Sequence, residues 1–545
     1  MTALPSLALP ALRGGQTSPR SVAAARVAGW ATPILAFVLG LWGNTGPSPW
    51  TDEIVTMDVA RRSWPELFAL LGQVDAVHGL HYVLMHLVGQ VTSVTEFTMR
   101  VPSATAVAVA VAGTVWLGRS LGGPRHGVCA GLVLAVAPTA SRYAQEGRSF
   151  AFVMAAAVLA TGALAKVLAG DGRRRWPIAY AVLVAVLGWF NIMGLLLLVA
   201  HAITVTWTRP GRRTIRRLAI AQAAGITAMA PLLFLALTQR SAVGASAPVT
   251  FGTPAAFFSW LLYPGQDTLL TSFKVLLIGS TLTALGALAV RRRKTPELIR
   301  AVGVPWLTVP PALLALATLV QPVFAYRYLV FCLPALALLL AAGILVLPWW
   351  ARVALVLAVS APLAFCHRAI RLEQSRSWDT LAVVRILRAH DAPGDTVLFS
   401  GARCGLISTA YQEAFARRTD LGRSGTAAAA AALDNPPADP ATLAHRLERA
   451  PRVWHVMCTH LSAAARTTAE RIAAAQEQAL WAAGLHPRRH FTIRGIEIIL
   501  ETRPGENSLE SPANTAAVRC PGQPGKACPA WLRTDPAEGA GEKTS

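Results

Sequence analysis

Charged side chains are scarce in this sequence. Asp, Glu, Lys and Arg together make up 14% of the 545 residues, whereas 54% of the residues are hydrophobic. The hydrophobic residues come in repeated blocks, and a block of about 17 to 25 apolar residues is long enough to cross roughly 30 Å of hydrocarbon as a helix. This composition excludes a soluble globular enzyme. It predicts a polytopic membrane protein with helical spans, because lipid offers the backbone no hydrogen-bond partner.

The apolar blocks predict about eleven spans. Six runs approach or reach the length needed to cross a bilayer, and five shorter runs have flanking residues that extend them. The longer runs cover residues 101–117, 150–168, 218–237, 275–290, 301–320 and 329–347. The shorter runs cover residues 27–42, 127–140, 177–190, 192–207 and 351–365.

Cysteine is also rare. The chain has seven cysteines and no C-x-x-C pair, which excludes a disulfide scaffold. Cys129, Cys332 and Cys366 are interpreted as small apolar residues in or beside helices. Cys404 and Cys458 lie in the predicted outer domain, each after a predicted strand. If these strands are neighbours in a parallel sheet, the cysteines approach the Cα separation of roughly 5.5 to 6 Å that a disulfide needs. The strand order is open, so this disulfide is a hypothesis.

Acidic residues are few before position 367, and basic residues gather in clusters. Lys and Arg accumulate in short cytoplasmic loops. With eleven spans, five basic clusters lie on the side of the N-terminus, and eight of the ten acidic residues lie on the opposite, outer side. The net charge of +22 therefore reports membrane topology, and no DNA-binding motif supports a nucleic-acid partner. The clusters are Arg13/Arg20/Arg26, Arg119/Arg125, Lys166/Arg173/Arg174/Arg175, Arg209/Arg212/Arg213/Arg216/Arg217 and Arg291/Arg292/Arg293/Lys294/Arg300.

The hydropathy falls after the last apolar run and divides the chain. We predict a cytoplasmic N-terminal segment, 1–26, and a transmembrane bundle, 27–366, whose outer catalytic loop is 44–100. An extracytoplasmic α/β domain, 367–502, and a disordered tail, 503–545, rich in Gly, Pro, Glu and Ser, complete the chain. Within the α/β domain we predict helices at 381–389 and 463–483 and strands at 396–400, 453–457 and 493–500.

Two adjacent carboxylates follow the first span directly. Asp52 and Glu53 stand between Trp50 and an apolar stretch, 54–57, at the predicted membrane–water boundary. A purely solvated pair gains little in apolar surroundings, whereas a partly dehydrated carboxylate suits general-base chemistry, so we favour a catalytic role. The other acids of this loop, Asp58, Glu66 and Glu96, are interpreted as ordinary solvated charges.

A second polar motif in the same loop combines a carboxylate, imidazoles and a phenol. Asp75, His78, His81 and Tyr82 occur within eight residues, ahead of an amphipathic stretch that can lie in the membrane interface. A divalent-metal site formed by the two histidines and Asp75 stays open as an alternative. Hydrogen-bonded histidines without a metal are the simpler interpretation, because the spacing alone is a weak signal.

Two further outer loops contribute Arg–Tyr pairs. Arg142-Tyr143 begins the segment R-Y-A-Q-E-G-R, which contains Glu146, and Arg327-Tyr328 opens the tenth span. Arginine at the top of a bundle can simply reach the lipid headgroups. The pairs also suit a lipid-linked phosphate, because guanidinium binds phosphate in a bidentate manner and aromatic rings pack against lipid or sugar. We favour the phosphate interpretation for Arg142 and Arg327.

Taken together, the motifs carry a family resemblance. An Asp-Glu pair after the first span, a D-x-x-H-x-L-x-Y segment, an R-Y-A-Q-E-x-R-S loop, an R-Y-L segment and a trailing soluble domain resemble type-C (GT-C) glycosyltransferases. The most similar branch is the family-39-like one of actinobacteria, related to protein O-mannosyltransferases and the lipid A aminoarabinose transferase. The resemblance covers about residues 27–370. Relatives often read H-P-P-L-Y-Y where this chain has H-G-L-H-Y.

The resemblance implies a multi-pass glycosyltransferase of the plasma membrane. Such an enzyme moves a sugar, with mannose favoured, from a polyprenyl-phosphate donor to a hydroxyl of a glycan, lipid or protein acceptor at the outer face. The Asp of the Asp-Glu motif falls on Asp52 as the expected base, with Glu53 beside it. No cofactor or metal ligand is assigned. The candidate substrate-binding residues are Asp75, His78, Tyr82, Arg142, Tyr143, Glu146, Arg327 and Tyr328.

Two other protein classes compete with this interpretation. A transporter or flippase for lipid-linked glycans would also be a helix bundle, but such proteins keep essential charges near the bilayer midplane and often show internal repeats. Here the charges lie at the predicted outer rim, and we find no repeat. A structural membrane scaffold explains neither the Asp-Glu pair nor the matched basic loops.

Overall fold

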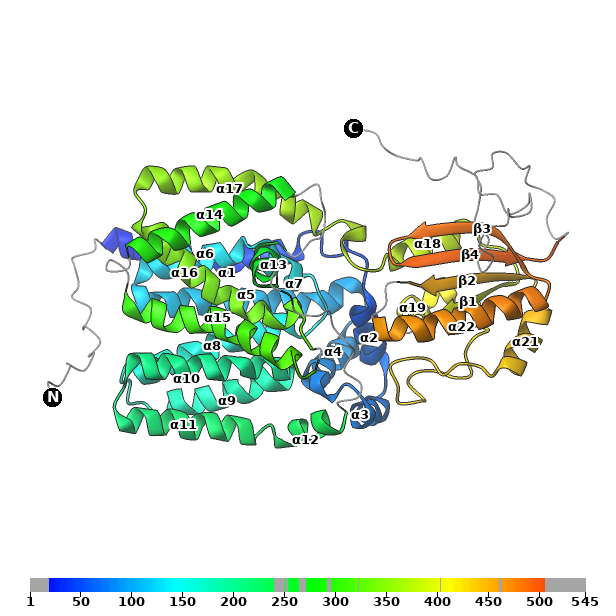
Figure 1. The fold of residues 1–545 in the computed structure, drawn as a ribbon, viewed down its shortest axis with the longest axis horizontal. Helices are drawn as coiled ribbons and strands as arrows, with labels where there is room; N and C mark the ends of the chain where they lie inside the picture. Colours follow the sequence, from blue (N-terminus) through cyan, green and yellow to red (C-terminus); the bar gives the residue numbers. More distant parts are fainter. Residues whose placement is uncertain are drawn as a thin grey trace. The chain divides into compact units, whose positions relative to one another are not determined.

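The computed structural model divides the chain into two compact units (Figure 1). One comprises Met1–Pro47 and Leu71–Ser375 and is called the bundle unit here; the other comprises Ser48–Leu70 and Arg376–Ser545 and is called the sheet unit. The structure describes residues 19–239, 250, 253–263, 271–291, 296–321, 323–401, 403–459 and 463–504. Arg13, Arg292, Arg293 and Lys294 of the basic clusters, and all but two residues of the predicted tail 503–545, lie outside the described residues.

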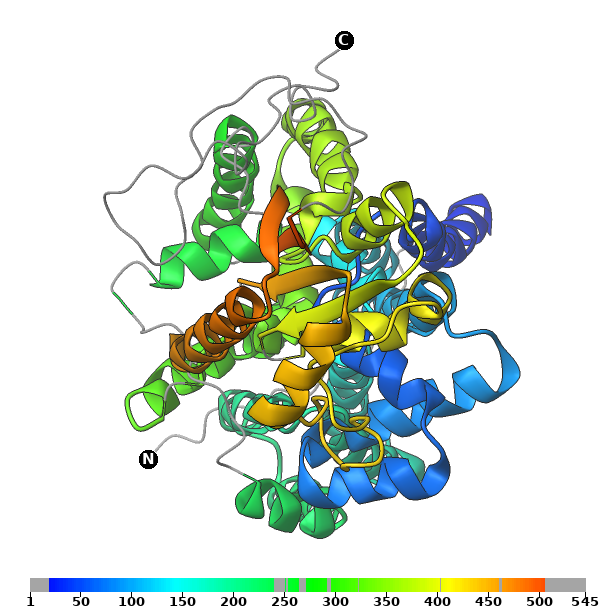
Figure 2. The same ribbon diagram turned by 90° about the vertical axis from the view of Figure 1, so that its right-hand side faces the viewer.

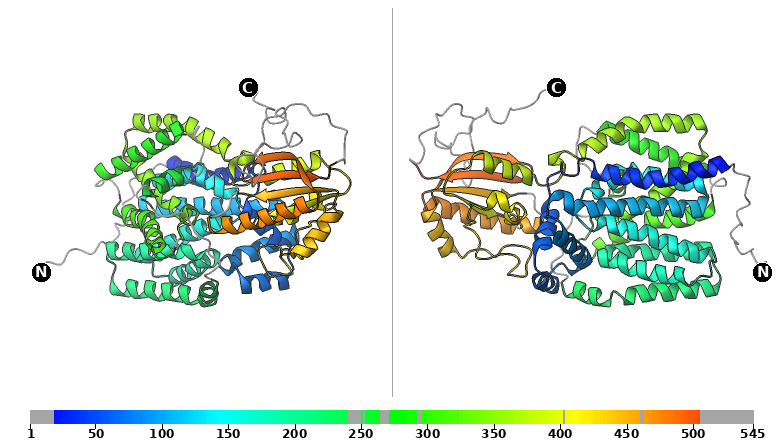
Figure 3. Two further views of the ribbon diagram at one scale, coloured as in Figure 1. Left: turned by 45° about the vertical axis from the view of Figure 1, so that its right-hand side comes forward. Right: turned by 180° about the vertical axis from the view of Figure 1, so that it is seen from behind.

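The bundle unit consists of helices that run side by side (Figure 3). Its helices up to the middle of the chain are α1 (Pro19–Leu41), η1 (Ala76–His78), α4 (Gly79–Val91), α5 (Glu96–Gly122), α6 (Pro124–Ala135), α7 (Pro138–Ala144), α8 (Phe150–Leu168), α9 (Arg175–Phe190), η2 (Ile192–Leu195) and α10 (Leu196–Thr208). The remaining ones are α11 (Arg212–Thr227), α12 (Ala230–Thr238), α13 (Thr253–Leu262), α14 (Thr271–Val290), α15 (Glu297–Thr318), η6 (Tyr326–Cys332), α16 (Leu333–Val346), α17 (Trp349–Ala369) and η7 (Glu373–Ser375).

Within the described residues, five helices are long and apolar enough to cross a membrane: α5, α8, α15, the continuous pair η6–α16, and α17. Two more pairs meet the same criteria together but are bent, α6–α7 by 63° and α11–α12 by 51°. Pro138 and Pro231 stand in the first turn of α7 and α12, where the missing N–H of proline interrupts a continuous helix. Every one of the eleven predicted runs overlaps a helix, which confirms the multi-pass bundle. The exact number of spans stays a prediction.

Helix α16 forms the centre of the bundle unit. It is apolar on all sides and buried from Leu333 to Gly343, as expected of a helix surrounded by other helices. It packs against α6, α14 and α15. Glycine allows its closest approach, because a Cβ at Gly343 would lie 2.0 Å from the carbonyl oxygen of Ala284 in α14.

The sheet unit contains a four-stranded sheet with the order β1-β2-β4-β3. The strands are β1 (Asp395–Ser400), β2 (Arg452–Cys458), β3 (His486–Ile493) and β4 (Ile496–Thr502). Strands β1 and β2 are parallel, whereas β4 runs antiparallel to both β2 and β3. Its helices are α2 (Thr51–Arg61), α18 (Thr380–Ala389), α19 (Leu406–Ala410), α20 (Gln412–Phe415), α21 (Pro440–Arg449) and α22 (Ala463–Ala482). Helix α3 (Trp64–Gln73) begins in the sheet unit and ends in the bundle unit.

The structure confirms the predicted small α/β fold but corrects one strand. The predicted strand 493–500 spans a hairpin, because Gly495 adopts φ +74 in the turn between β3 and β4. A left-handed residue of this kind ends one strand and starts the next. The other two predicted strands and both predicted helices of this domain are present within one or two residues of their expected bounds.

Both faces of the sheet are covered by helices (Figure 2). On one face, Leu398 and Val453 pack with Leu447 of α21 and Leu480 of α22. On the other face, the Trp454 ring lies 6.1 Å from the ring of His390, the residue that ends α18. This alternation along neighbouring strands is the pattern expected of a sheet buried on both sides.

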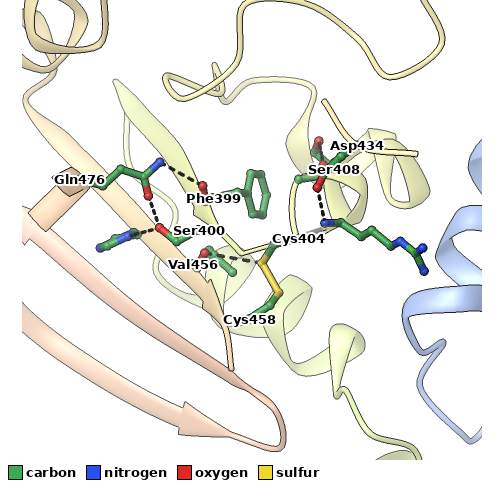
Figure 4. The surroundings of a disulfide bond; sticks show 11 residues. Phe399, Ser400, Cys404, Ser408, Asp434, Val456, Cys458 and Gln476 are labelled. Carbon is green, nitrogen blue, oxygen red and sulfur yellow. Dashed lines mark hydrogen bonds between the residues drawn. A yellow bond between two sulfur atoms is a disulfide. The ribbon is translucent and has the colours of Figure 1, made fainter. Parts of the chain in front are cut away.

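A disulfide joins Cys404 and Cys458, as hypothesised from the sequence (Figure 4). Their Cα atoms are 5.8 Å apart. The bond forms because β1 and β2 are parallel neighbours, so both chain segments leave the sheet at the same edge. It therefore closes the loop that follows β1 onto the last residue of β2.

Candidate functional site

The predicted site residues fall in both units. Asp52 and Glu53 belong to the sheet unit, and the eight predicted substrate-binding residues belong to the bundle unit. The segment 48–70, predicted as part of the outer loop 44–100, thus groups with the C-terminal sheet. The two groups of residues are described in turn.

Asp52 and Glu53 occupy the first turn of α2. The helix starts after Trp50, whose backbone is extended, and both carboxylates stand where the helix dipole favours negative charge. Glu53 is buried, with 4% of its surface exposed, whereas the Asp52 side chain keeps 15%. Asp52 is therefore a largely shielded carboxylate that keeps some exposure.

Arg403 holds the Asp52 carboxylate. Its Nη1 lies 3.4 Å from Asp52 Oδ1, across a sequence separation of 351 residues. The backbone N–H of Arg403 donates a 2.7 Å hydrogen bond to Asp434 Oδ2. Burial raises the pKa of the Asp434 carboxyl, and the hydrogen bond from Arg403 opposes that shift. The arginine is thus fixed at its backbone while its side chain contacts Asp52.

Two further arginines fasten the other end of α2 within the sheet unit. Arg61 donates to the carbonyl oxygen of Ala410 at 3.2 Å, and Arg62 donates to that of Ala432 at 2.7 Å. Arg62 also pairs with Asp58 at 2.6 Å. The interpretation of Asp58 as a solvated charge is therefore wrong: it is buried and neutralises an arginine on the next turn of its helix.

In the bundle unit, Asp75 and Tyr82 come together as the motif predicts. Asp75 adopts φ +63 ahead of η1, and Tyr82 of α4 donates a hydrogen bond to its Oδ2. Arg148, from the loop between α7 and α8, donates to the Tyr82 hydroxyl at 3.2 Å and lies 5.8 Å from the centre of its ring. Burial, and then the nearby Asp75, raise the pKa of Tyr82, so its hydroxyl stays protonated.

The two histidines of this motif contact different partners. His78 Nε2 lies 3.9 Å from Asp75 Oδ1, whereas His81 Nε2 is 3.1 Å from the carbonyl oxygen of Gly147. Burial, followed by the charge of Arg148, lowers the pKa of His81 to about 3, so its ring is neutral. In the part of the chain that the structure describes, no group of three or more His, Cys, Asp or Glu side chains is arranged to hold a metal ion.

Three of the remaining predicted residues, Tyr143, Arg327 and Tyr328, are linked through ring contacts that include Phe150, the first residue of α8. The ring of Tyr143 meets that of Phe150 edge-on, with centroids 5.5 Å apart, and Phe150 is 6.3 Å from Tyr328 of η6. The Arg327 guanidinium lies 5.3 Å from the centre of the Tyr328 ring. The two predicted Arg–Tyr motifs are therefore linked through their aromatic rings.

Arg142 and Glu146 occupy different surroundings. Arg142 is half-buried and donates to the carbonyl oxygen of Ser375, the last residue of η7, at 3.3 Å. Glu146 is buried, and its backbone carbonyl accepts a 2.8 Å hydrogen bond from the N–H of Arg148. The loop thus places the polar Arg148 and the aromatic Phe150 two residues apart.

Three residues with specific polar contacts escaped the sequence analysis. Arg148 stands in a recognised motif, so its pairing with Tyr82 had a local signal. Arg100 is buried and donates to the carbonyl oxygens of Asn44 and Pro47, which fixes the chain as it leaves α1. Arg403 has no motif around it, and only the tertiary contact with Asp52 identifies it.

An apolar groove of about 470 Å³ lies between α9 and α11 in the bundle unit, and α4 contributes one lining residue. Leu80 lines it from α4, Val182 and Trp189 from α9, and Gly225 from α11. Its lining suits a hydrocarbon chain and offers little to a polar ligand.

Comparisons with known proteins identify the fold. No family model and no curated protein sequence matches this chain. The crystal structure of apo ArnT from Cupriavidus metallidurans is similar with a TM-score of 0.56 and 12% identity, covering 88% of this chain and 98% of ArnT.

Two further solved structures are similar to this chain. ArnT from the same organism bound to undecaprenyl phosphate has a TM-score of 0.53 and 12% identity, covering 90% of this chain and 98% of ArnT. The oligosaccharyltransferase AglB from Archaeoglobus fulgidus, in complex with an inhibitory peptide and a dolichol-phosphate, has a TM-score of 0.49 and 11% identity, covering 91% of this chain and 76% of AglB. The chain therefore has the fold of the ArnT structures.

Proposed function

We propose that this chain is a membrane glycosyltransferase that moves a sugar from a polyprenyl-phosphate donor to an acceptor hydroxyl, with Asp52 as the general base. The observation that carries the proposal is the shielded Asp52 carboxylate at the start of α2, held by Arg403 at 3.4 Å. A carboxylate that is mostly withdrawn from water and fixed in direction suits proton abstraction.

The chemistry assigns each group one role. The acceptor oxygen attacks the anomeric carbon of the donor while its proton passes to Asp52. The bond between the anomeric carbon and the phosphate oxygen breaks, and the polyprenyl phosphate leaves with the bonding electrons. Glu53, the deeper of the two carboxylates, orients its neighbour or the acceptor.

Features of the bundle unit support a lipid-linked donor. The apolar groove beside Leu80 suits a polyprenyl chain, and Arg142 and Arg327 carry the charge that a lipid phosphate requires. ArnT, which has the same fold, has been solved with undecaprenyl phosphate bound. Because the basic loops predict the cytoplasmic side of the bundle, we assign the reaction to the outer face. The family resemblance makes mannose the first sugar to test.

The test offers labelled polyprenyl-phosphate sugars, mannose first, to membranes that contain the protein. Asp52→Asn keeps the shape of the side chain but removes the proton acceptor, so transfer is expected to fall by about 10² to 10⁴ fold. Glu53→Gln is expected to cost less. The abundance of each variant in the membrane is measured beside the rate, and undiminished transfer by a normally inserted Asp52→Asn protein would refute the base assignment.

A second pair of measurements separates donor binding from chemistry. Arg327→Ala is expected to raise the KM for the donor more than it lowers kcat, because its proposed partner is the lipid phosphate of the ground state. A transporter or flippase would instead move labelled lipid across sealed vesicles without forming a new glycosidic bond. Translocation without transfer by the wild-type protein would therefore favour that alternative.

A further inference from the structure

The contact between Arg403 and the Asp52 carboxylate lies within the sheet unit. Helix α2 comes from the segment just after the first helix of the chain, and Arg403 comes from the loop that follows β1. Both belong to one compact unit. The loop after β1 of the C-terminal sheet thus supplies a residue that contacts the proposed base.

The loop that carries Arg403 is fixed by three bonds near its start, of which Figure 4 shows the disulfide. The Arg403 N–H donates to Asp434 at 2.7 Å, and the Cys404 N–H donates to the carbonyl oxygen of Gly401 at 3.2 Å. The next side chain, Cys404, is joined by the disulfide to Cys458 at the end of β2. Because the backbone of this loop is already fixed, no backbone ordering is needed when the Arg403 side chain contacts the carboxylate.

Helix α2 is held to the same unit independently of Arg403. Arg61 and Arg62 donate to carbonyl oxygens at 410 and 432, and Arg62 is buried against Asp58. These contacts keep the helix in place when the Arg403 side chain is changed. The Arg403–Asp52 pair itself is partly exposed, with 36% and 15% of the two side chains accessible, and pairs of this exposure contribute little to folding stability. The pair is therefore better suited to orienting the carboxylate than to holding the fold.

We propose that Arg403 is a positioning residue that orients the Asp52 carboxylate for proton abstraction, so that the C-terminal sheet is required for catalysis through this contact. The inference rests on the proposed function, because a positioning role for Arg403 requires that Asp52 is the general base. Arg403 acts through the base in this role, so its removal is expected to lower kcat and to leave donor binding unchanged. A misdirected base loses rate steeply, since displacement by about 1 Å costs up to roughly a hundredfold.

The kinetic experiment compares Arg403→Gln, Arg403→Lys and Arg417→Gln in the full-length membrane protein. Arg417 is an exposed arginine of the same unit, so its substitution makes the same charge change away from α2. We expect Arg403→Gln to lower kcat at least about tenfold with little change in the donor KM, Arg403→Lys to recover most of the loss, and Arg417→Gln to behave as wild type. An unchanged or raised kcat in Arg403→Gln would overturn the proposal.

A double-mutant cycle shows whether Arg403 acts through Asp52. In an Asp52→Asn background the oriented base is gone, so Arg403→Gln is expected to cause no further loss of the residual rate. A merely structural arginine would lower the rate by the same factor in both backgrounds. That additive result would reject the positioning role even if Arg403→Gln alone is slow.

A chemical readout works without any transfer activity. Coupling of Asp52 to an amine by a water-soluble carbodiimide, followed by peptide mass spectrometry, is expected to rise several-fold in Arg403→Gln and to stay at the wild-type level in Arg417→Gln. Equal labelling of Asp52 in the wild type, Arg403→Gln and Arg417→Gln would show that Arg403 does not hold Asp52. If the wild-type protein transfers no sugar but its Asp52 is labelled less than that of Arg403→Gln, the proposed function is rejected while the Arg403–Asp52 pair is supported.

Discussion

Glu501 places a carboxyl group inside the sheet unit. It lies on β4 with 5% of its surface exposed, and burial, followed by the nearby Glu477 carboxyl, raises its pKa to about 8. The ordinary value is 4.5, so between pH 4.5 and 8 the folded state keeps a proton that the unfolded state releases. The group's stabilising contribution is therefore complete below about pH 4.5 and is lost as the pH rises to about 8.

This linkage predicts a pH-dependent effect of Glu501→Gln. Glutamine stays neutral at all pH values, so the variant and the wild type are expected to unfold alike below pH 4.5. At pH 8 the variant is expected to be more stable by about 4 kcal/mol, because the pKa is raised from 4.5 to about 8 and each unit corresponds to about 1.4 kcal/mol. Thermal melts of the full-length protein in detergent across this range measure the difference. Glu413→Gln, an exposed carboxylate of the same unit, is the control, and a difference that does not grow with pH would contradict the assignment.

Residue identities could be predicted where a motif surrounds them. The Asp-Glu pair and the Asp75–Tyr82 segment are each short in sequence, and the structure brings Asp75 and Tyr82 into contact as expected. Arg403 could not be predicted in this way, because its partner is 351 residues away and its neighbours carry no pattern. Asp58 was misassigned for the same reason, since burial of an outer-loop acid depends on what packs over its helix.

At the scale of elements, glycine sets the distance between two helices of the bundle. A Cβ at Gly343 of α16 would lie 2.0 Å from the Ala284 carbonyl oxygen and 2.6 Å from the carbonyl carbon. These are backbone atoms of α14, which cannot rotate away as a flexible side chain does, so Gly343→Ala must push the two helices apart. Overpacking of this kind costs about 1 to 3 kcal/mol.

Gly286 of α14 provides the matched control, because a Cβ there meets nothing within 4 Å. We expect Gly343→Ala to lower the melting temperature of the detergent-purified protein and Gly286→Ala to leave it unchanged or slightly raised. Equal melting temperatures for the two variants would show that α14 and α16 are not in tight contact.

Hydropathy and periodicity predicted whether a segment is a helix or a strand, but they did not always predict where the segment begins and ends. The predicted strand 493–500 straddles the turn at Gly495, because Ile493 and the residues from Ile496 onward all fit a strand pattern and only the backbone direction separates them. The parallel pairing of β1 and β2, and with it the disulfide, depends on strand order, which local sequence does not encode.

At the scale of the whole molecule, the distribution of basic residues predicts how the chain lies in the membrane. A reporter fused after Arg217 is expected to read cytoplasmic, and one fused after Arg371 extracytoplasmic, because the basic loops fix one end of the bundle on the cytoplasmic side. Alkaline phosphatase and a fluorescent protein, each active on one side only, measure the two positions. The same reading from both fusions would mean that an odd number of spans between them has been miscounted.

The sequence by itself determined the class of this protein and the nature of its parts. Long apolar runs require helical spans, the loss of hydropathy after residue 366 requires a different solvent for the C-terminal part, and short motifs identify carboxylates suited to chemistry. These properties are local, so they can be read along the chain.

Only the tertiary structure decided which distant residues meet. It grouped the segment 48–70 with the C-terminal sheet, joined Cys404 to Cys458 and set Arg403 against Asp52. Each of these contacts joins residues at least 54 positions apart and depends on how the elements pack. The environment of the proposed base therefore follows from packing, which no local pattern in the sequence contains.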